Sequence, residues 1–452
     1  MAECNAQLRL LFHPSRPVEL DFEAPEISSD GGALLVRQID KRLGLTAGFA
    51  ACLPDHRNPS RVVHNRHEQA RQRIFQVALG YEDCNDAQFL RRDPLLNTVC
   101  DRSPQDPRGL SSQPTLSRFE NAPDGLTLRR LLDFFERSYV ESLPANTSEI
   151  ILDIDTTDDE THGAQQLSFF HGFYDHHMYH PVMVYDGDSG QLITAILRPG
   201  NVHASRGAVG VLSRLIRTIK QRFPHASIAV RGDSGFCVPR MLDALEKLHQ
   251  ELGEVFFLLG IAKNAVLCRK AGDTMAWAEE LQRRLGRRVQ RFDQFSYAAG
   301  SWKRERRIVA KAEHSAKGPN PRFVITNIEG FDPETLYRAY CQRGQCENWI
   351  KDFKNALQAD RLSCSTFRAN FFRLLLHLAA YRLLHALRVE AARESADLGK
   401  AQFDTLRLRL LKVAALVSQS VRRIWVRLPR AFPFAEVFRR LAARLEIPPA
   451  PA

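Results

Sequence analysis

Apolar and polar residues recur with helical spacing along the first third of this chain. After the segment Ser28–Gly32, the run ALLVRQIDKRL places apolar residues on one side of a helix, and LTLRRLLDFFERSYVESL does the same further on. The Ser-Ser-Asp-Gly-Gly segment before the first run resembles a capped helix start, because small polar side chains satisfy free backbone N–H groups there. We therefore predict a mainly helical region over residues 1–145.

The pattern changes at about residue 146. SEIILDIDTTDD is a short apolar, β-branched run that ends in acids, and HPVMVYDGDSGQLITAILRPG predicts a hairpin with strands 180–186 and 191–197. A basic amphipathic helix over 206–222 follows, then a strand ending at Asp233, a helix in VPRMLDALEKLHQ and a strand in EVFFLLGIAK. This order predicts a mixed α/β sheet rather than a Rossmann repeat.

Arginine-rich sequence interrupts this pattern over residues 262–330. Two strands are predicted there, in RRIVAKAEH and RFVITNI, so we interpret the segment as an inserted β-rich subdomain. Later come two basic amphipathic runs, FRLLLHLAAYRLLHALRV and TLRLRLLKVAALVSQSVRRIWVRL, both predicted as helices. The expected division is a helical region 1–145, a mixed α/β domain 146–360 and a helical C-terminal region 361–452.

Charge is the compositional feature that bears on function. Of 452 residues, 44% are hydrophobic and 25% charged, which is ordinary for a globular protein, but the net charge is +11 and the pI about 9.3. Such a balance favours an acidic partner, nucleic acid first, although a basic surface also serves solubility. No apolar window approaches the length of a membrane span and the start does not resemble a signal peptide, so we expect a cytoplasmic protein without a membrane partner.

A zinc site is not indicated. The nine cysteines are scattered and form no CxxC pair. The segment His176–His180 fits neither a helical HExxH motif nor a finger, so we expect strand and loop packing there.

One helix near the C-terminal third carries an unusual set of side chains. In LYRAYCQRGQCENWIKDFKNAL, the offsets between Tyr340, Arg343, Glu347 and Lys354 fall within roughly 60° of arc at about 100° per residue. Lys351 lies beside them. A basic stripe around one carboxylate suits a site that handles a phosphate backbone at a metal, but a solvated helix with an Arg343–Glu347 pair would show the same pattern.

Two further carboxylates stand at predicted strand ends. Asp155 and its neighbour Asp153 point to the same face of one strand, and Asp233 ends an apolar strand between glycines. A solvated strand end and a turn aspartate are the simpler interpretations. With Glu347, Asp155 and Asp233 form an oxygen-rich set for Mg²⁺ or Mn²⁺. Two such ions about 4 Å apart activate an attacking water or hydroxyl and stabilise the leaving oxygen of a phosphodiester.

The spacing Tyr-x2-Arg-x3-Glu-x6-Lys, at Tyr340, Arg343, Glu347 and Lys354, resembles the signature of one group of DDE transposases of bacterial insertion sequences. The segments DIDTTDDETHGAQ, YDGDSGQL, RGDSGF and RGQCENWIKDFKN look most like insertion sequence family 1380. The resemblance covers about residues 20–445. It implies a ribonuclease-H-like catalytic core with a β-rich insertion between the second Asp and the Glu.

The resemblance also implies roles for individual residues. Asp155, Asp233 and Glu347 would be the catalytic ligands of two Mg²⁺ or Mn²⁺ ions, with Asp155 favoured over Asp153 because it directly precedes a Thr pair. DNA phosphates would be bound by Tyr340, Arg343, Lys351 and Lys354. Trp302 of the insertion could hold a flipped base, and Trp277 is also available, although a core role suits either.

One competing motif deserves a comparison. DIDTT also matches the DxDxT start of haloacid-dehalogenase phosphatases, in which the first Asp is the nucleophile. That interpretation needs a later acidic pair such as GDxxxD, and GDSGFC at 232–237 lacks the second Asp.

The expected function is that of a transposase which binds terminal inverted repeats and then cuts and joins double-stranded DNA, both repeats and target. Residues 61–80 and Thr115–Arg118 would position the DNA ends, and a homodimer would hold two ends in a synaptic complex of the bacterial cytoplasm, associated with the nucleoid when bound. The alternatives are a non-catalytic DNA-binding protein derived from a transposase and a generic ribonuclease-H-like nuclease.

Overall fold

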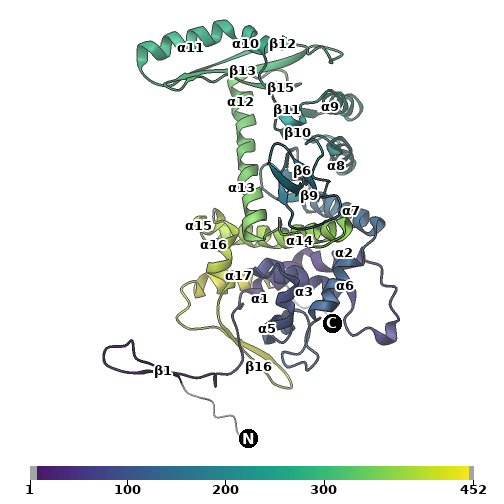
Figure 1. The fold of residues 1–452 in the computed structure, drawn as a ribbon, viewed down its shortest axis with the longest axis vertical. Helices are drawn as coiled ribbons and strands as arrows, with labels where there is room; N and C mark the ends of the chain where they lie inside the picture. Colours follow the sequence, from purple (N-terminus) through teal and green to yellow (C-terminus); the bar gives the residue numbers. More distant parts are fainter. Residues whose placement is uncertain (1–7, 447–452) are drawn as a thin grey trace. The chain divides into compact units, whose positions relative to one another are not determined.

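The computed structural model describes residues 8–446 and contains two compact units (Figure 1). Both cross the boundaries expected from the sequence, because one unit joins segments from the two ends of the chain. Of the described residues, the first unit comprises 8–45, Arg57–Ser117 and 386–446, and the second Thr46–His56 and Arg118–His385. None of the helices within residues 8–446 is long and apolar enough to cross a membrane.

Short helices build most of the first unit, as predicted for its N-terminal part. They pack around α1, whose neighbours include α3, α5 and α17. Their bounds are α1 (Ala33–Leu43), α3 (Arg66–Leu79), α5 (Pro94–Val99) and α17 (Ala435–Leu445). In α3 every residue from Gln69 to Leu79 is buried, and Arg71 is paired with Asp101. This stretch of the region expected to position DNA ends is therefore a core helix of the unit.

The start of α1 differs from the predicted capped start. Gly32 is the N-cap and no side chain caps the helix. Asp30 instead accepts hydrogen bonds from Tyr81 Oη at 2.8 Å and from Lys412 Nζ at 2.7 Å. A Cβ on Gly32 would lie 2.3 Å from Leu411 Cα, so the glycine permits close backbone contact.

The prediction of a helix through residues 405–428 is wrong. Only its first turns are helical, and β16 (Ala415–Gln419) and β17 (Ile424–Arg427) then form an antiparallel hairpin. The edge of β16 pairs with β3 (Ile27–Ser28). The segments LVSQ and IWVR flank a polar turn, and side chains alternate between two faces in each of them, which is typical of strands. The helical spacing of the apolar residues before them suggests that the helix continues.

A mixed sheet of nine strands forms the centre of the second unit, with the order β12-β13-β15-β11-β10-β4-β8-β9 and β14 beside β13. The bounds are β4 (Glu149–Thr156), β8 (Val182–Asp186), β9 (Leu192–Ile196), β10 (Ser227–Gly232), β11 (Val255–Ile261), β12 (Val289–Tyr297), β13 (Arg306–Ser315), β14 (Gly318–Pro319) and β15 (Arg322–Thr326). A separate small sheet holds β5 (Asp159–Glu160), β7 (His176–Tyr179) and β6 (Phe169–His171).

The connectivity is that of a ribonuclease-H-like fold. β9, β8 and β4 form an antiparallel meander, and β10 and β11 continue the sheet parallel to β4. The parallel strands require crossover helices, which are α8 (Ala208–Arg222) and α9 (Pro239–Leu252). The predicted fold class, the hairpin and both helices are confirmed.

The insertion extends this sheet instead of forming a separate β-rich subdomain. It opens with two helices that the sequence did not predict, α10 (Ala265–Lys270) and α11 (Gly272–Leu285). Its strand β15 then pairs antiparallel with β11, and β13 and β12 follow outward. Within the second unit, Figure 1 shows these strands in one line with β10 and β11.

Helices cover both faces of the central strands. Leu152 and Ile154 of β4 join a core that includes residues of α8 and α9. Since side chains alternate along a strand, Asp153 and Asp155 point to the other face. That face is covered by α12 (Pro333–Cys341), which packs on β11, β12 and β13. In Figure 1, α13 (Gln345–Lys351) continues the line of α12.

Candidate active site

Asp155 and Asp233 meet where the central parallel strands end. Gly232 of β10 pairs with Ile154 of β4, so the residue after each partner, Asp233 and Asp155, occupies neighbouring positions at the same edge. Asp155 is 7% exposed and Asp233 half-buried. The backbone N–H of Gly235 donates to Asp233 Oδ1 at 2.9 Å, which fixes the carboxylate at the start of a 3₁₀ turn.

Asp155 lies among hydrogen-bond donors and other carboxylates at this edge. Thr156 N–H donates to its Oδ1 at 2.9 Å, and Arg343 Nη2 lies 3.4 Å from its Oδ2. Burial raises the pKa of Asp155 to about 6; Arg343 opposes the rise, while Asp233 and Glu347 add to it. Both of the other predicted carboxylates therefore act on the charge of Asp155.

Tyr340 lies over the end of the next strand. A Cβ on Gly260 would lie 2.5 Å from Tyr340 Oη, so the missing side chain makes room for this hydroxyl. Burial raises the pKa of Tyr340; Arg343 lowers it, and Asp233 raises it further. The pKa of Arg343 is raised: burial opposes its charged form, but Asp155 and Tyr340 favour it.

The helix that carries these residues is not regular, contrary to the prediction. A 3₁₀ turn (Gln342–Gly344) separates α12 from α13, and a π-helical turn (Asp352–Ala356) follows α13. Neither turn advances by 100° per residue, so the predicted arc does not describe this segment. Lys354 therefore contacts a different partner from Arg343.

Lys354 is bound within the protein. Its Nζ donates to Asp158 Oδ1 and to the Asp158 carbonyl, both at 2.9 Å, and lies 3.6 Å from Asp360 Oδ2. Burial acts to raise the pKa of Asp158, but the hydrogen bond and charge of Lys354 outweigh it and lower that pKa. Lys351 is exposed to solvent.

Asp153 is placed differently from Asp155. Both its oxygens are bound by Arg231, Oδ1 by Nε at 2.6 Å and Oδ2 by Nη2 at 2.7 Å, and both side chains are buried. Arg231 Nη1 also donates to the Ala339 carbonyl at 2.9 Å. This pair joins β4 and β10 to α12 and leaves no oxygen of Asp153 directed to a ligand.

Glu347 faces solvent. Among residues 8–446 its carboxylate has no hydrogen-bond or ion-pair partner, although its charge reaches Asp155. In that part of the chain, no three His, Cys, Asp or Glu side chains lie close enough to hold a metal ion. The edge thus brings Asp155 and Asp233 together with Arg343 and Tyr340, but it does not bring Glu347 to coordinating distance.

The profile of the transposase DDE domain, group 1, matches residues 12–449. The chain belongs to this family. It is therefore a DDE-type DNA transposase, and enzymes of this family generally use divalent metal ions.

One solved structure similar to the transposase is a cryo-EM structure of the piggyBac transposase synaptic complex with hairpin DNA. The two share 11% sequence identity over 93% of this chain and 83% of that chain, with a TM-score of 0.44. No curated protein matches the sequence.

The donors at the edge of the transposase sheet suit a divalent cation. They are all carboxylate oxygens, the ligands preferred by Mg²⁺ and Mn²⁺. The raised pKa of Asp155 comes from burial and from Asp233 and Glu347, and a cation would relieve that repulsion.

A cleft of about 370 Å³ adjoins Asp233 in the transposase. Sequence reasoning missed its two cations, Lys263 and Arg322, because nothing in their local sequence marks them. Tyr174, in the turn between β6 and β7, was missed as well. Its pKa is raised mainly by burial and, to a smaller extent, by the charges of Asp158, Asp155 and Asp233. The cleft lining comprises Asp233, Ser234, Gly260, Ile261, Ala262, Lys263, Pro321, Arg322, Phe323, Tyr337 and Tyr340.

Trp302 lies away from the carboxylates. Its ring packs on Tyr297, with centroids 5.3 Å apart, and on the guanidinium of Arg306 at 5.2 Å. Arg307 pairs with Thr326, which pairs with Leu258, so the loop before β13 lies toward the edge opposite Asp233. The structure thus gives Trp302 the packing role that was the simpler alternative.

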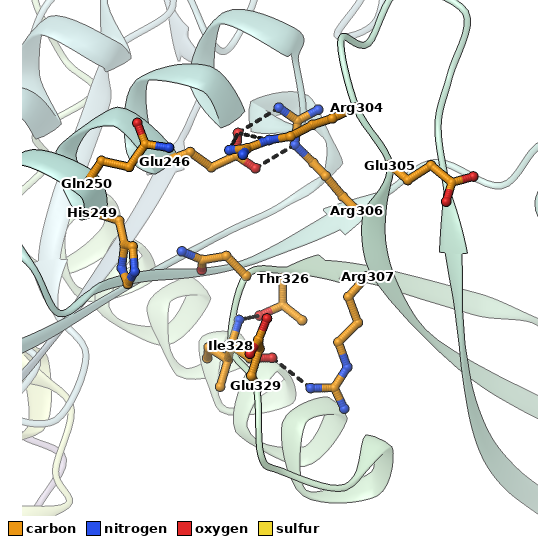
Figure 2. A pocket seen from close by; sticks show the side chains of 11 residues that line it. Glu246, His249, Gln250, Arg304, Glu305, Arg306, Arg307, Thr326, Ile328 and Glu329 are labelled. Carbon is orange, nitrogen blue, oxygen red and sulfur yellow. Dashed lines mark hydrogen bonds and ion pairs between the residues drawn. The ribbon is translucent and has the colours of Figure 1, made fainter.

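A second cleft, of about 290 Å³, lies at that opposite edge (Figure 2). The guanidinium groups of Arg304 and Arg306 turn toward the carboxylate of Glu246, which Arg306 Nε binds at 2.7 Å. Arg307 donates to the Ile328 carbonyl at 2.7 Å. The arginine-rich insertion therefore uses these three cations within the protein.

Proposed function

We propose that this transposase binds the terminal inverted repeats of its mobile element and catalyses DNA strand cleavage and strand transfer at the edge formed by Asp155 and Asp233. The observation that carries the proposal is the meeting of Asp155 and Asp233 at neighbouring strand ends. Burial raises the pKa of Asp155, Asp233 and Glu347 add to that rise, and Arg343 Nη2 lies 3.4 Å from the Asp155 carboxylate. Buried carboxyl groups with a pKa shifted by neighbouring charges are typical of functional sites.

Asp155, Asp233 and Glu347 would hold two Mg²⁺ or Mn²⁺ ions. When bound, these ions would activate the attacking oxygen and stabilise the leaving oxygen of a phosphodiester. Asp155 and Asp233 would supply fixed oxygens at strand ends, whereas Glu347, which is exposed and outside coordinating distance, would have to move with its helix to supply the third. Asp153 would act by positioning α12 through Arg231 instead of sharing the ligand set.

The phosphates beside the cut would be bound by the cations around this edge. Arg343 is already fixed next to Asp155, and Tyr340 Oη is directed over Gly260. Lys351 is exposed, and Lys354 would exchange Asp158 for a phosphate oxygen. The spacing of Tyr340, Arg343, Glu347 and Lys354 supports assignment to the Y-R-E-K group, most like insertion sequence family 1380.

The partners follow from this activity. Double-stranded DNA is the substrate, both as terminal repeats and as target, and the net charge of +11 suits it. A homodimer would hold two ends in the synaptic complex. Thr115–Arg118 and the exposed Arg61 are the parts of the N-terminal region proposed to position the ends. The enzyme would act in the bacterial cytoplasm, at the nucleoid.

An end-cleavage assay in Mg²⁺ or Mn²⁺ tests the proposal. We expect wild type to nick DNA carrying the repeats and to join the freed 3′ ends to target DNA, and Asp233→Asn to do neither. Asp273→Asn is the matched control, because Asp273 is an exposed acid in α11. Equal cutting by wild type and Asp233→Asn would refute the proposed site. If wild type cuts DNA but does not join it to target, the protein is a nuclease. If wild type binds DNA but does not cut it, the protein is a non-catalytic DNA-binding derivative.

A further inference from the structure

A buried arginine without an acidic partner stands at the end of β9. Arg198 is 6% exposed, and burial lowers its pKa to about 10, so it is charged at neutral pH. Its Nε donates to the His180 carbonyl at 2.7 Å, and its Nη1 to the carbonyls of Ala204 at 2.7 Å and Arg206 at 2.8 Å. Among residues 8–446 no carboxylate pairs with it, and its Nη2 has no hydrogen-bond partner. Buried charges are normally paired.

Arg198 lines a cavity of about 630 Å³ together with polar and apolar residues. The polar or basic side chains are those of Arg198, Asn201, His203 and Arg206. The remaining lining residues are Phe169, Val182, Ile196, Pro199, Val202, Gly207 and Val211. The exposed Arg206 forms no side-chain hydrogen bond or ion pair within the described residues.

The cavity lining includes the start of a long helix. Gly207 is the N-cap of α8, which runs for 15 residues, and no side chain caps its first turn. The N-terminus of a helix attracts anions through its free N–H groups and its dipole. It thus reinforces the positive charge of Arg198 in the same cavity.

The loop after β9, which forms part of this cavity, is held by contacts with β7 and the residue that follows β7. The backbone N–H of His180 donates to the Arg198 carbonyl at 3.1 Å, and Tyr179 bridges to Pro199. A Cβ on Gly200 would lie 1.9 Å from the Met178 carbonyl oxygen, so only glycine allows β7 this close. A cavity fixed in this way loses little entropy when it binds a ligand.

The cavity lies at the same sheet edge as Asp155. Thr156 pairs with Val182, and Val182 pairs with Ile196, so the ends of β4 and β9 are two strands apart. Adjacent strands are about 4.8 Å apart, which puts the cavity on the order of 10 Å from Asp155 along the sheet. Val182 and Ile196 of the cavity lie on the face that α8 covers, whereas Asp155 points to the other face. A DNA strand therefore has to pass around the strand ends to touch both.

We propose that this cavity binds one backbone phosphate of the DNA strand presented to Asp155 and Asp233. The side chain of Arg206 and the start of α8 contact the phosphate oxygens, the buried charge of Arg198 attracts them from behind, and the apolar lining residues pack against the adjoining deoxyribose. This inference rests on the proposed function, since it assumes that DNA reaches that edge. A phosphodiester with its sugar suits the cavity better than a bare ion, because much of the lining is apolar.

DNA-binding titrations at several salt concentrations test it, with end DNA and full-length protein. Each phosphate contact contributes about 0.9 to the slope of log K against log salt. We expect Arg206→Gln and Arg198→Met to weaken binding about tenfold and to lower the slope by about 1. Lys247→Gln should match wild type, because Lys247 is an exposed cation near the C-terminal end of α9.

Single methylphosphonate substitutions in the DNA locate the contact. At one position the neutral linkage should weaken binding by wild type but not further by Arg206→Gln. If Arg206→Gln and a folded Arg198→Met both bind with the wild-type slope, the inference is refuted. The inference is also refuted if inorganic phosphate raises the melting temperature of wild type but not of Arg198→Met, while both proteins show the same salt dependence of DNA binding. The cavity would then bind free phosphate only. Failure of wild type to cut repeats would instead refute the proposed function.

Discussion

Arg231 binds both carboxylate oxygens of Asp153, Nε to Oδ1 at 2.6 Å and Nη2 to Oδ2 at 2.7 Å. The neighbouring Asp155, two residues further along β4, accepts a hydrogen bond from Thr156 N–H at 2.9 Å, and its nearest side-chain cation is Arg343 at 3.4 Å. Arg231 on β10 therefore makes Asp153 a structural aspartate, whereas Asp155 on the same face of the same strand is the proposed metal ligand.

Arg231→Met should destabilise the protein strongly, because it leaves the carboxylate of Asp153 buried and uncompensated. Removing one partner of a buried ion pair costs about 3–5 kcal/mol, whereas replacing both partners costs much less. We therefore expect Arg231→Met to lower the free energy of unfolding in denaturant by that amount, and Asp153→Leu combined with Arg231→Met to recover most of the loss. Equal stability of Arg231→Met and wild type would contradict the pairing.

Asp155 should make stability depend on pH when metal is chelated. Burial, Asp233 and Glu347 raise its pKa from 3.8 to about 6 in the folded protein, so the folded state binds the proton more tightly than the unfolded state. Its contribution to stability is complete below pH 4 and is lost as pH rises through 6, by roughly 3 kcal/mol. Asp155→Asn should therefore be the more stable form at pH 7, and the two should converge near pH 4. Parallel stability curves for the two proteins would exclude a raised pKa.

Asp158 should restrain DNA binding through Lys354. Asp158 Oδ1 holds the Lys354 ammonium at 2.9 Å, so Asp158→Asn removes one of the two carboxylates beside that charge and leaves it more available to phosphate. We expect Asp158→Asn to tighten binding of end DNA a few-fold, and Lys354→Met to weaken it and lower the salt slope by about 1. Fluorescence anisotropy at several salt concentrations measures both effects. Weaker binding by a folded Asp158→Asn protein would show that the pair serves the loop instead of DNA.

Gly260→Ala should displace Tyr340. The new Cβ would lie 2.5 Å from Tyr340 Oη, and the next nearest atom, Ser234 N, is 3.1 Å away. Overpacking of this kind costs about 1–3 kcal/mol. In a Tyr340→Phe background the same substitution should cost clearly less, because the hydroxyl is gone. Chemical denaturation of the four proteins tests this coupling, and an equal cost in both backgrounds would place the clash elsewhere.

The central strands could be predicted from the sequence because they are buried, and buried strands are continuous apolar runs. Apolar runs ending in acids located β4 and β10, and the family resemblance connected Asp155, Asp233 and Glu347. The partner of Asp153 could not be predicted, because the register between β4 and β10 brings Arg231 to it. Glu347 was expected among the ligands, yet it stands exposed and away from coordinating distance.

Other features depend on distant backbone and were not predictable. The 3₁₀ and π-helical turns around α13 leave no mark in a hydrophobic pattern, so Lys354 was expected beside Arg343. The helical period around residue 405 concealed the β16–β17 hairpin, whose edge pairs with β3 from the other end of the chain. Arg198 carries no motif, and its significance arises only from the cavity around it.

The way in which β15 joins β11 limits how the insertion can change in evolution. Deleting the segment between β11 and α12 would leave a long apolar edge strand without a partner, which favours aggregation. The segment is thus not a removable cassette. Relatives can vary its tip loops and its helices α10 and α11, but they must retain a strand in the place of β15.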